Sequence, residues 1–322
     1  MTAPAPDQAP GAALPGEIEA VERRGDRVFS RVAVGAGTAI LVALAAVAVF
    51  LVAQSLPAIW APAGSFRGTD GTFWDYVAPL AFGTVWAAAI ALVIAVPLAV
   101  GIALFISHYA PRRLAQPLGY IIDLLAAVPS VVYGLWGITV LAPATVPLYE
   151  WLAENAGWFP LFAGPASGTG RTVLTVAIVL AVMVLPIITA LCREVFVQTP
   201  TLHQEAAYAL GATWWEMVRM TVFPYARSGI ISASMLGLGR ALGETMAVAM
   251  VLSPSAIISF AVLQSENPST IAANIALNFP ESAGLQVNAL IATGLVLFVI
   301  TLIVNSLARW IVSRHERSLE SR

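Results

Sequence analysis

Six stretches of this sequence are apolar over about twenty residues each, and they restrict the possible folds more than any other feature. An α-helix rises ~1.5 Å per residue, so about twenty residues cross the ~30 Å hydrocarbon core of a bilayer. The sequence therefore predicts an all-α, polytopic membrane protein with six transmembrane helices embedded in a lipid bilayer. They are expected at Val32–Ala53, Leu80–Ile106, Ile121–Leu141, Val173–Leu191, Ile230–Leu252 and Ala289–Val312.

The basic residues are all arginines, and their distribution sets the expected orientation. Thirteen of the sixteen arginines lie before the first stretch, in the second and fourth connecting loops, or at the end of the chain. Only Arg67 and Arg171 fall in the opposite loops, and Arg240 lies inside the fifth stretch. Because loops rich in positive charge stay in the cytoplasm, the sequence predicts a plasma-membrane protein with both termini in the cytoplasm.

The apolar stretches also divide the chain into four expected parts. Residues 1–31 are expected to form a disordered cytoplasmic tail and a basic flank, since the first 22 are rich in Pro, Ala and Gly. Residues 32–76 hold the first transmembrane helix and an external loop. That apolar run exceeds the ~7–15 residues of the apolar region in a cleaved signal peptide, so we expect a retained signal anchor. Residues 77–312 form the membrane core, and residues 313–322 form a cytoplasmic tail.

Arg240 and Glu244 lie near the middle of the fifth apolar stretch, where a charge costs ~2.5–3.5 kcal/mol or more. If the stretch is one helix, the two side chains are one turn apart on the same face and can form an ion pair. The pair indicates a path for an anion, with Thr245 beside it. The alternative is a buried ion pair that only fixes the packing of the helices.

Composition excludes several classes of function. The chain has no lysine, so it cannot form an ATP-binding P-loop. Cys192 is its only cysteine, and its three histidines are scattered, so no metal site is expected. The sequence predicts no catalytic residues, no cofactor and no nucleic-acid partner. It predicts a membrane component that is not an enzyme.

Two external segments should carry short helices. In Ala142–Arg171, the spacing of Leu148, Trp151 and Leu152 is typical of an amphipathic helix lying on the outer membrane surface. Ser269–Phe279 is apolar but too short to span a bilayer, so it is expected to be re-entrant or interfacial.

The loop between the fourth and fifth stretches predicts a helix–turn–helix. Glu205–Leu210 favours a helix that Gly211 ends. Thr213 and Glu216 have the spacing of a capping box for a second helix, which Pro224 is expected to stop. The loop is more apolar than a free cytoplasmic loop should be, so it needs a partner surface.

This loop resembles the EAA loop of ABC-importer permeases. The matching residues are Glu205, Ala206, Ala207, Gly211 and Pro224, although Thr221 and Phe223 stand where the family has an aliphatic residue and leucine. The resemblance implies a type I ABC-importer permease fold, with the loop at about residues 200–226. It also implies a coupling helix at Glu205–Gly211 that docks on a separate ATPase.

Two further strings, LLAAVPSVVYGLWG at Leu124–Gly137 and GLGRALGETMAVAMV at Gly237–Val251, resemble the phosphate-specific permeases of the Pst system. The long amino-terminal tail and the Ala142–Arg171 insertion are more similar to PstC-type subunits than to PstA-type subunits. The resemblance implies a prokaryotic importer of inorganic phosphate. The implied partners are a PstA-type permease, a PstB-type ATPase dimer and a PstS-type phosphate-binding protein.

On this interpretation, Arg240, Glu244 and Thr245 line the substrate path, and Glu205, Ala206, Ala207 and Gly211 couple to the ATPase. Two alternatives stay open. One is an ABC permease for another oxyanion, such as sulfate or molybdate. The other is a non-transporting membrane anchor or sensor, which would have no reason to place an arginine at mid-membrane.

Overall fold

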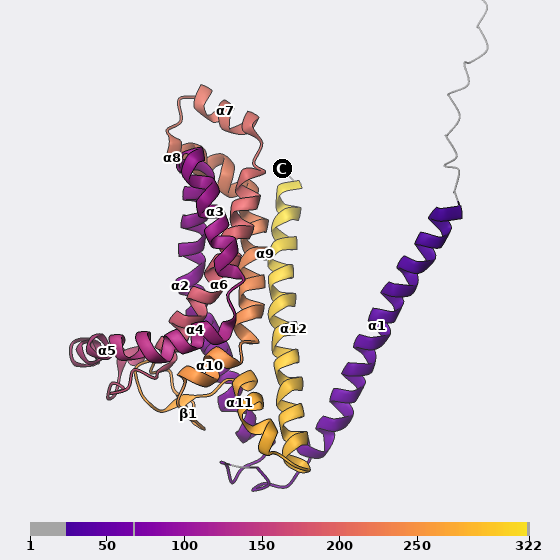
Figure 1. Ribbon diagram of the computed structural model, residues 1–322, viewed down its shortest axis with the longest axis vertical. Coiled ribbons are helices and arrows are strands. Elements are labelled where there is room, and N and C mark those ends of the chain that lie inside the picture. Colours follow the sequence, from indigo (N-terminus) through magenta and orange to yellow (C-terminus); the bar gives the residue numbers. More distant parts are fainter. Residues whose placement is uncertain (1–23, 67, 321–322) are drawn as a thin grey trace, which may run out of the picture. The chain divides into compact units, whose positions relative to one another are not determined.

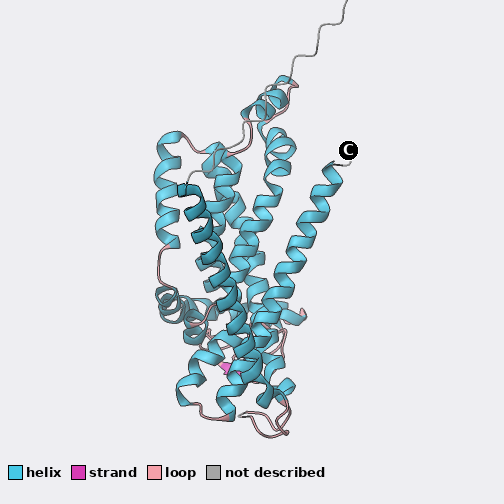
Figure 2. Ribbon diagram, turned by 90° about the vertical axis from the view of Figure 1, so that its right-hand side faces the viewer, coloured by secondary structure: helices cyan, strands magenta, loops and turns pink. Residues whose placement is uncertain are grey.

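The computed structural model describes residues 24–66 and 68–320, and the expected disordered tail of residues 1–22 lies outside them. Almost all of the described secondary structure is helical, as the colouring of Figure 2 shows. The exception is one pair of two-residue parallel strands, β1 at Pro254–Ser255 and β2 at Asn267–Pro268. The chain divides into two compact units at Phe50, and each unit is described separately.

The first unit contains the beginning of helix α1, Arg24–Ile59. Val28–Ile59 is apolar and long enough to cross a membrane. The side chains from Val28 to Phe50 are exposed. A helix that is apolar on all its faces requires lipid or protein around it. The helix predicted at Val32–Ala53 is therefore confirmed.

Three long helices pack together at the centre of the second unit (Figure 1). They are α2, Phe73–Leu104, α6, Val173–Val197, and α9, Phe223–Leu242. Helix α2 contacts α6 most extensively, and α12, Leu285–Glu320, lies beside α9. Small side chains let helix backbones approach closely. Helix α2 provides them as a row of buried alanines at every fourth position: Ala87, Ala91, Ala95, Ala99 and Ala103.

Two of the six predicted transmembrane helices are broken. The helix predicted at Ile121–Leu141 is divided between α3, Arg112–Ala126, and α4, Ser130–Trp136. Pro129 lies at this break, because it has no amide proton and disfavours helix at the preceding residue. The helix predicted at Ile230–Leu252 is divided by Gly243–Thr245 between α9 and α10, Met246–Val251. The other four predicted segments are helical throughout.

Five helical stretches of the described chain are long and apolar enough to cross a membrane. One of them was not predicted in this form. It joins α4 to the π-helical segment η2, Gly137–Leu141, and to α5, Ala142–Ala156. Helix α5 is the amphipathic helix expected there, and its Leu148 and Trp151 are exposed. Its place on the outer membrane surface stays a prediction. The full set is Val28–Ile59, Phe73–Tyr109, Ser130–Ala156, Val173–Val197 and Leu285–Trp310.

Several short elements gather at one end of the second unit, which we call the α11 end (Figure 1). Helix α11, Ile271–Asn278, is the short apolar helix predicted within Ser269–Phe279, and it packs against α2, α10 and α12. Thr84 of α2 accepts a hydrogen bond from the Ile271 amide at 2.9 Å. Two 3-10 turns, η3 at Pro160–Phe162 and η5 at Phe279–Glu281, complete this end.

The opposite end, which we call the α7 end, carries the predicted helix–turn–helix (Figure 1). Helix α7, Thr201–Ala209, is followed by Gly211 at φ +83°, a conformation that glycine adopts readily. Thr213 then begins α8, Trp214–Met217, and its amide donates to the Glu216 carboxylate at 2.8 Å, as predicted. This end also contains η1, a π-helical extension of α2 at Phe105–Tyr109.

Pro224 does not stop the second helix, contrary to the prediction. Helix α8 continues through the π-helical segment η4, Val218–Val222, directly into α9. Local π-helical adjustment is one way in which a membrane helix tolerates the missing amide proton of a proline. One continuous helical path therefore joins Trp214 at the α7 end to Leu242.

Candidate functional site

The two helix breaks lie against each other, because α4 packs on α10. Gly134 makes this approach possible, since a β-carbon built on it would lie only 2.8 Å from the Ala247 Cα. A β-carbon on Gly137 would lie 2.9 Å from a methyl group of Val251. The sequence strings at Leu124–Gly137 and Gly237–Val251 thus meet at one place in the fold.

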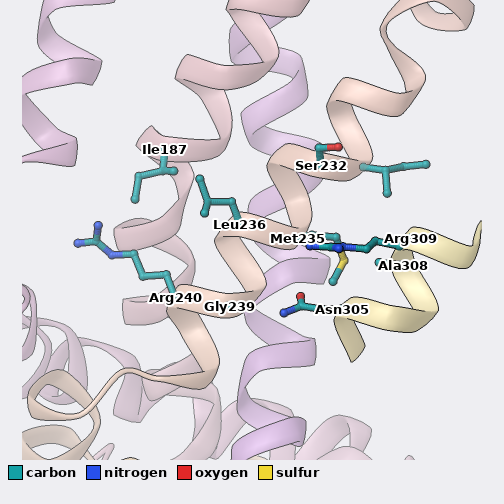
Figure 3. A pocket seen from close by; sticks show the side chains of 10 residues that line it. Ile187, Ser232, Met235, Leu236, Gly239, Arg240, Asn305, Ala308 and Arg309 are labelled. Atoms are coloured by element: carbon teal, nitrogen blue, oxygen red, sulfur yellow. The ribbon is translucent and has the colours of Figure 1, made fainter. Parts of the chain in front are cut away.

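Arg240 belongs to the last turn of α9, immediately before the second break. It is partly buried and lines a cavity of about 930 Å³ whose walls come from α6, α9 and α12. Figure 3 shows its side chain extending from α9 on the side of Ile187. The role of Arg240 in lining the substrate path stays a prediction.

The expected ion pair between Arg240 and Glu244 does not form in the described structure. The prediction assumed one continuous helix, but α9 ends at Leu242, so the residues are no longer a helical turn apart. Glu244 is buried, and its Oε1 instead accepts a hydrogen bond from the Ala247 amide at 3.2 Å. The carboxylate therefore caps the beginning of α10. Thr245 lies in the same turn, where its hydroxyl donates to the Gly243 carbonyl at 3.1 Å.

Tyr133 of α4 connects the first break to Arg240, and the sequence analysis did not single it out. Its hydroxyl donates to the Leu125 carbonyl at 2.9 Å, so it satisfies an acceptor at the end of α3. The Arg240 guanidinium is close enough to this phenol for an electrostatic interaction. The sequence signal that could have identified Tyr133 is its position four residues after Pro129. A helix broken at a proline leaves carbonyls that need donors, and a tyrosine hydroxyl can supply one.

Arg171 fixes the other end of α10, although the sequence analysis placed it simply in an external loop. Its guanidinium donates to the carbonyls of Val251 at 3.2 Å, Leu252 at 3.0 Å and Met250 at 3.4 Å. A cation is favourable at the carbonyl end of a helix. Asn267 is fully buried behind it and donates to the Arg171 carbonyl at 3.1 Å. Charged side chains thus hold α10 at both ends.

The predicted coupling residues lie far from this cavity, at the α7 end (Figure 1). Glu205 and Ala206 are exposed on α7, whereas Ala207 is buried and its carbonyl accepts from the Ala212 amide. Helix α7 and the turn after it also expose Leu202, Tyr208 and Leu210. An exposed apolar surface of this kind is typical of an interface with another protein. The two predicted groups of site residues are therefore separate surfaces joined by the α8–α9 path.

No set of three or more His, Cys, Asp or Glu side chains that could hold a metal ion occurs within residues 24–66 and 68–320. Cys192 is buried in α6 and His108 lies in η1. Of the polar groups at the two breaks, Arg240 and Tyr133 interact electrostatically, whereas Glu244 bonds to the backbone of α10.

Comparison with known proteins gives one consistent family. Residues 95–317 match the model of the family described as binding-protein-dependent transport system inner membrane component. The chain is 48% identical to phosphate transport system permease protein PstC 2 of Mycobacterium tuberculosis, over 89% of this chain and 91% of that protein. It is 44% identical to PstC of Mycobacterium leprae, over 90% and 93% of the two chains. It is 42% identical to PstC of Mesorhizobium japonicum, over 90% of each.

The fold has a counterpart among solved structures. The chain is similar to a chain in the crystal structure of a bacterial ABC transporter involved in the import of the acidic polysaccharide alginate, with a TM-score of 0.59. The match covers 90% of this chain and 96% of the other at 15% sequence identity, so it supports the fold alone.

The family model and the PstC relatives show what kind of protein this is. It is a multi-pass inner-membrane subunit of a transporter, which works with binding-protein and ATPase components, and is not an enzyme. The chain belongs to the family of binding-protein-dependent transport system inner membrane components and, within it, to the PstC-type permeases.

Proposed function

We propose that this chain forms half of the membrane path of an ATP-driven importer of inorganic phosphate. The observation that carries the proposal is the partly buried Arg240, which lines an open cavity whose lining residues include no Asp or Glu. A guanidinium presents planar donors that match a phosphate oxyanion, and its attraction for the anion is strong away from bulk water. The names of the relatives, phosphate transport system permeases, support phosphate as the substrate.

Glu244 has a different role in this proposal from the one that its sequence position suggested. It holds the start of α10 through the Ala247 amide, so it sets the geometry of the break rather than neutralising Arg240. Thr245 lies in the same turn and completes the predicted path-lining group. Because no carboxylate of the described residues forms an ion pair with the guanidinium, the positive charge of Arg240 remains available to an anion. A transport site must also release its ion, and one guanidinium gives binding that is weak enough for release.

The α7 end faces the cytoplasm in this proposal, because the positive-inside rule places Arg113, Arg219 and Arg227 there. Helix α7, with Glu205, Ala206 and Ala207, would then dock on a PstB-type ATPase dimer. The α11 end would receive a PstS-type phosphate-binding protein. A PstA-type permease would supply the second half of the path, and rocking of the two subunits would alternate access.

The test is phosphate uptake by the complete transporter after Arg240→Gln, a change that removes the charge and keeps much of the size. Uptake of radiolabelled phosphate should fall by about tenfold or more, the usual cost of losing one charge-assisted hydrogen bond. Arg113→Gln is the matched control, since Arg113 is an exposed arginine in α3 that does not line the cavity.

Both variants must co-purify with the other subunits for the comparison to hold. Normal uptake by an assembled Arg240→Gln transporter would contradict the proposed path. Competition with unlabelled sulfate or molybdate tests the substrate. We expect only phosphate to compete, and equal competition by the other oxyanions would contradict phosphate specificity.

A further inference from the structure

The cavity that Arg240 lines has a second arginine in its wall, Arg309 of α12. Sequence position suggested only that Arg309 marks the cytoplasmic end of the last transmembrane helix. Figure 3 instead shows its side chain directed from α12 toward α9, next to Met235. The cavity is thus lined by two arginines from two helices, and none of the residues lining it is acidic.

Arg309 has suitable polar neighbours. Asn305 precedes it by one helical turn on α12, and Ser232 faces them from α9 (Figure 3). Within the described residues, neither Arg309 nor the Asn305 amide has a hydrogen bond or ion pair. The Ser232 hydroxyl donates to the Ser228 carbonyl at 2.9 Å and can rotate toward another acceptor. Arg309 and Asn305 thus offer donors without a partner at one side of the cavity, and Ser232 offers a hydroxyl that can redirect its proton.

This group is displaced from Arg240 along the helix axis. Ser232 precedes Arg240 by eight residues of α9, which is ~12 Å at ~1.5 Å per residue. The displacement is toward the α7 end, because α9 begins there (Figure 1). The Arg309 group and Arg240 therefore line one open cavity at different levels, on the sides of α12 and of Ile187 respectively (Figure 3).

We propose that Arg309, Asn305 and Ser232 form a second binding position for a phosphate-group anion, on the α7 side of Arg240. The proposal rests on the proposed function of Arg240 and extends it to a second step along the path. A cavity with two cations and no carboxylate attracts anions, and the combination of guanidinium, amide and hydroxyl donors matches the oxygens of a phosphate group. Two weak positions in series also let an ion move on more easily than one strong position would.

A phosphate group can reach this position from two sources, the transported ion or the headgroup of a phospholipid. The experiment separates them with two measurements on the complete, purified transporter. Uptake of radiolabelled phosphate into proteoliposomes reports the transported ion. Native mass spectrometry of the complex in a maltoside detergent, which contains no phosphate, reports retained phospholipid. The variants are Arg309→Gln, Arg309→Lys and Ser232→Ala, with Arg113→Gln as the control for loss of an exposed arginine.

If the ion in transit occupies the position, Arg309→Gln lowers the maximal uptake rate about tenfold relative to Arg113→Gln. The half-saturating phosphate concentration stays unchanged, because the external binding protein captures the substrate. Arg309→Lys retains most of the rate, since it keeps the charge, and Ser232→Ala lowers the rate by about twofold to fivefold. A purely structural role for Arg309 would not be rescued by charge in this way.

If a lipid headgroup occupies the position, Arg309→Gln loses one retained phospholipid while its uptake rate equals that of Arg113→Gln. Equality with Arg113→Gln in both uptake and retained lipid would overturn the proposal. Ser232→Ala, which removes one oxygen atom, keeps the test decisive if Arg309→Gln fails to assemble. These outcomes differ from failure of the proposed function, in which the unmodified transporter itself would take up no phosphate.

Discussion

The carboxylate of Glu244 accepts a hydrogen bond from the Ala247 amide, and only 8% of the residue is exposed to solvent. Amides at the beginning of a helix have no partner within that helix, and an unpaired buried amide costs ~1–3 kcal/mol. A side-chain acceptor at this point therefore stabilises the break between α9 and α10. At the scale of single residues, Glu244 therefore acts on the backbone and does not pair with Arg240.

Two substitutions of Glu244 separate these roles. Glu244→Ala removes the acceptor and should lower the stability of the purified transporter by ~1–2 kcal/mol, the usual cost of losing a helix cap. Glu244→Gln keeps an acceptor oxygen without the charge and should cost less than half as much. Thermal unfolding of each variant measures the difference. If Glu244 instead served as the counter-charge of Arg240, Glu244→Gln would be as harmful as Glu244→Ala.

Helix α10 has only six residues, and a helix of that length is not stable by itself in water. Its order comes from its neighbours. Helix α4 covers one side, and Arg171 binds the last carbonyls. At the scale of elements, the two broken helices therefore support each other, with glycine where they approach most closely.

Gly134→Ala should disturb this contact. The added methyl group would lie 2.8 Å from the Ala247 Cα, a backbone atom that cannot move aside cheaply. Overpacking of this kind typically costs ~1–3 kcal/mol. Gly101→Ala on the exposed side of α2 is the matched control, because nothing lies within 4 Å of its added carbon. Alanine should be neutral or slightly stabilising there. Equal unfolding temperatures for the two variants would contradict close α4–α10 packing.

The sequence predicted the apolar helices well but not the breaks. Hydropathy measures only how apolar a stretch is. Both broken stretches are apolar enough to form one continuous transmembrane helix, so hydropathy does not reveal the breaks. Pro129 signalled the first break locally, whereas the second has only Gly243 and Glu244 to indicate it. That break depends on contacts with α4, Arg171 and Asn267. These lie in other parts of the sequence, so no local pattern predicts the break. The partner of Glu244 was mispredicted for the same reason, since the i to i+4 rule applies only within an unbroken helix.

At the scale of the whole molecule, the continuous path from Trp214 to Leu242 connects the two predicted sites. One end lies beside α7, the predicted ATPase contact, and the other ends next to Arg240. The expected stop at Pro224 would have placed a flexible joint between them. Because the helix is continuous, we expect movement of the α7–α8 turn to reach the cavity as movement of a rigid element. Gly211 is the one glycine with a positive φ in that turn.

Gly211→Val tests this connection at its beginning. A β-branched residue at φ +83° costs ~1–2 kcal/mol, so the turn should reorganise and α7 should change its direction relative to α8. We expect less ATPase subunit to co-purify with the chain, and less phosphate-dependent ATP hydrolysis per complex.

Gly64→Val is the matched control for Gly211→Val. Gly64 has φ +80° and equally open surroundings, but it lies between α1 and α2 rather than in the α7–α8 turn. The control should keep its ATPase subunit, because the two substitutions impose the same backbone strain at different places. If both variants co-purified with equal amounts of the ATPase subunit, the predicted role of the α7–α8 turn in energy coupling would be contradicted.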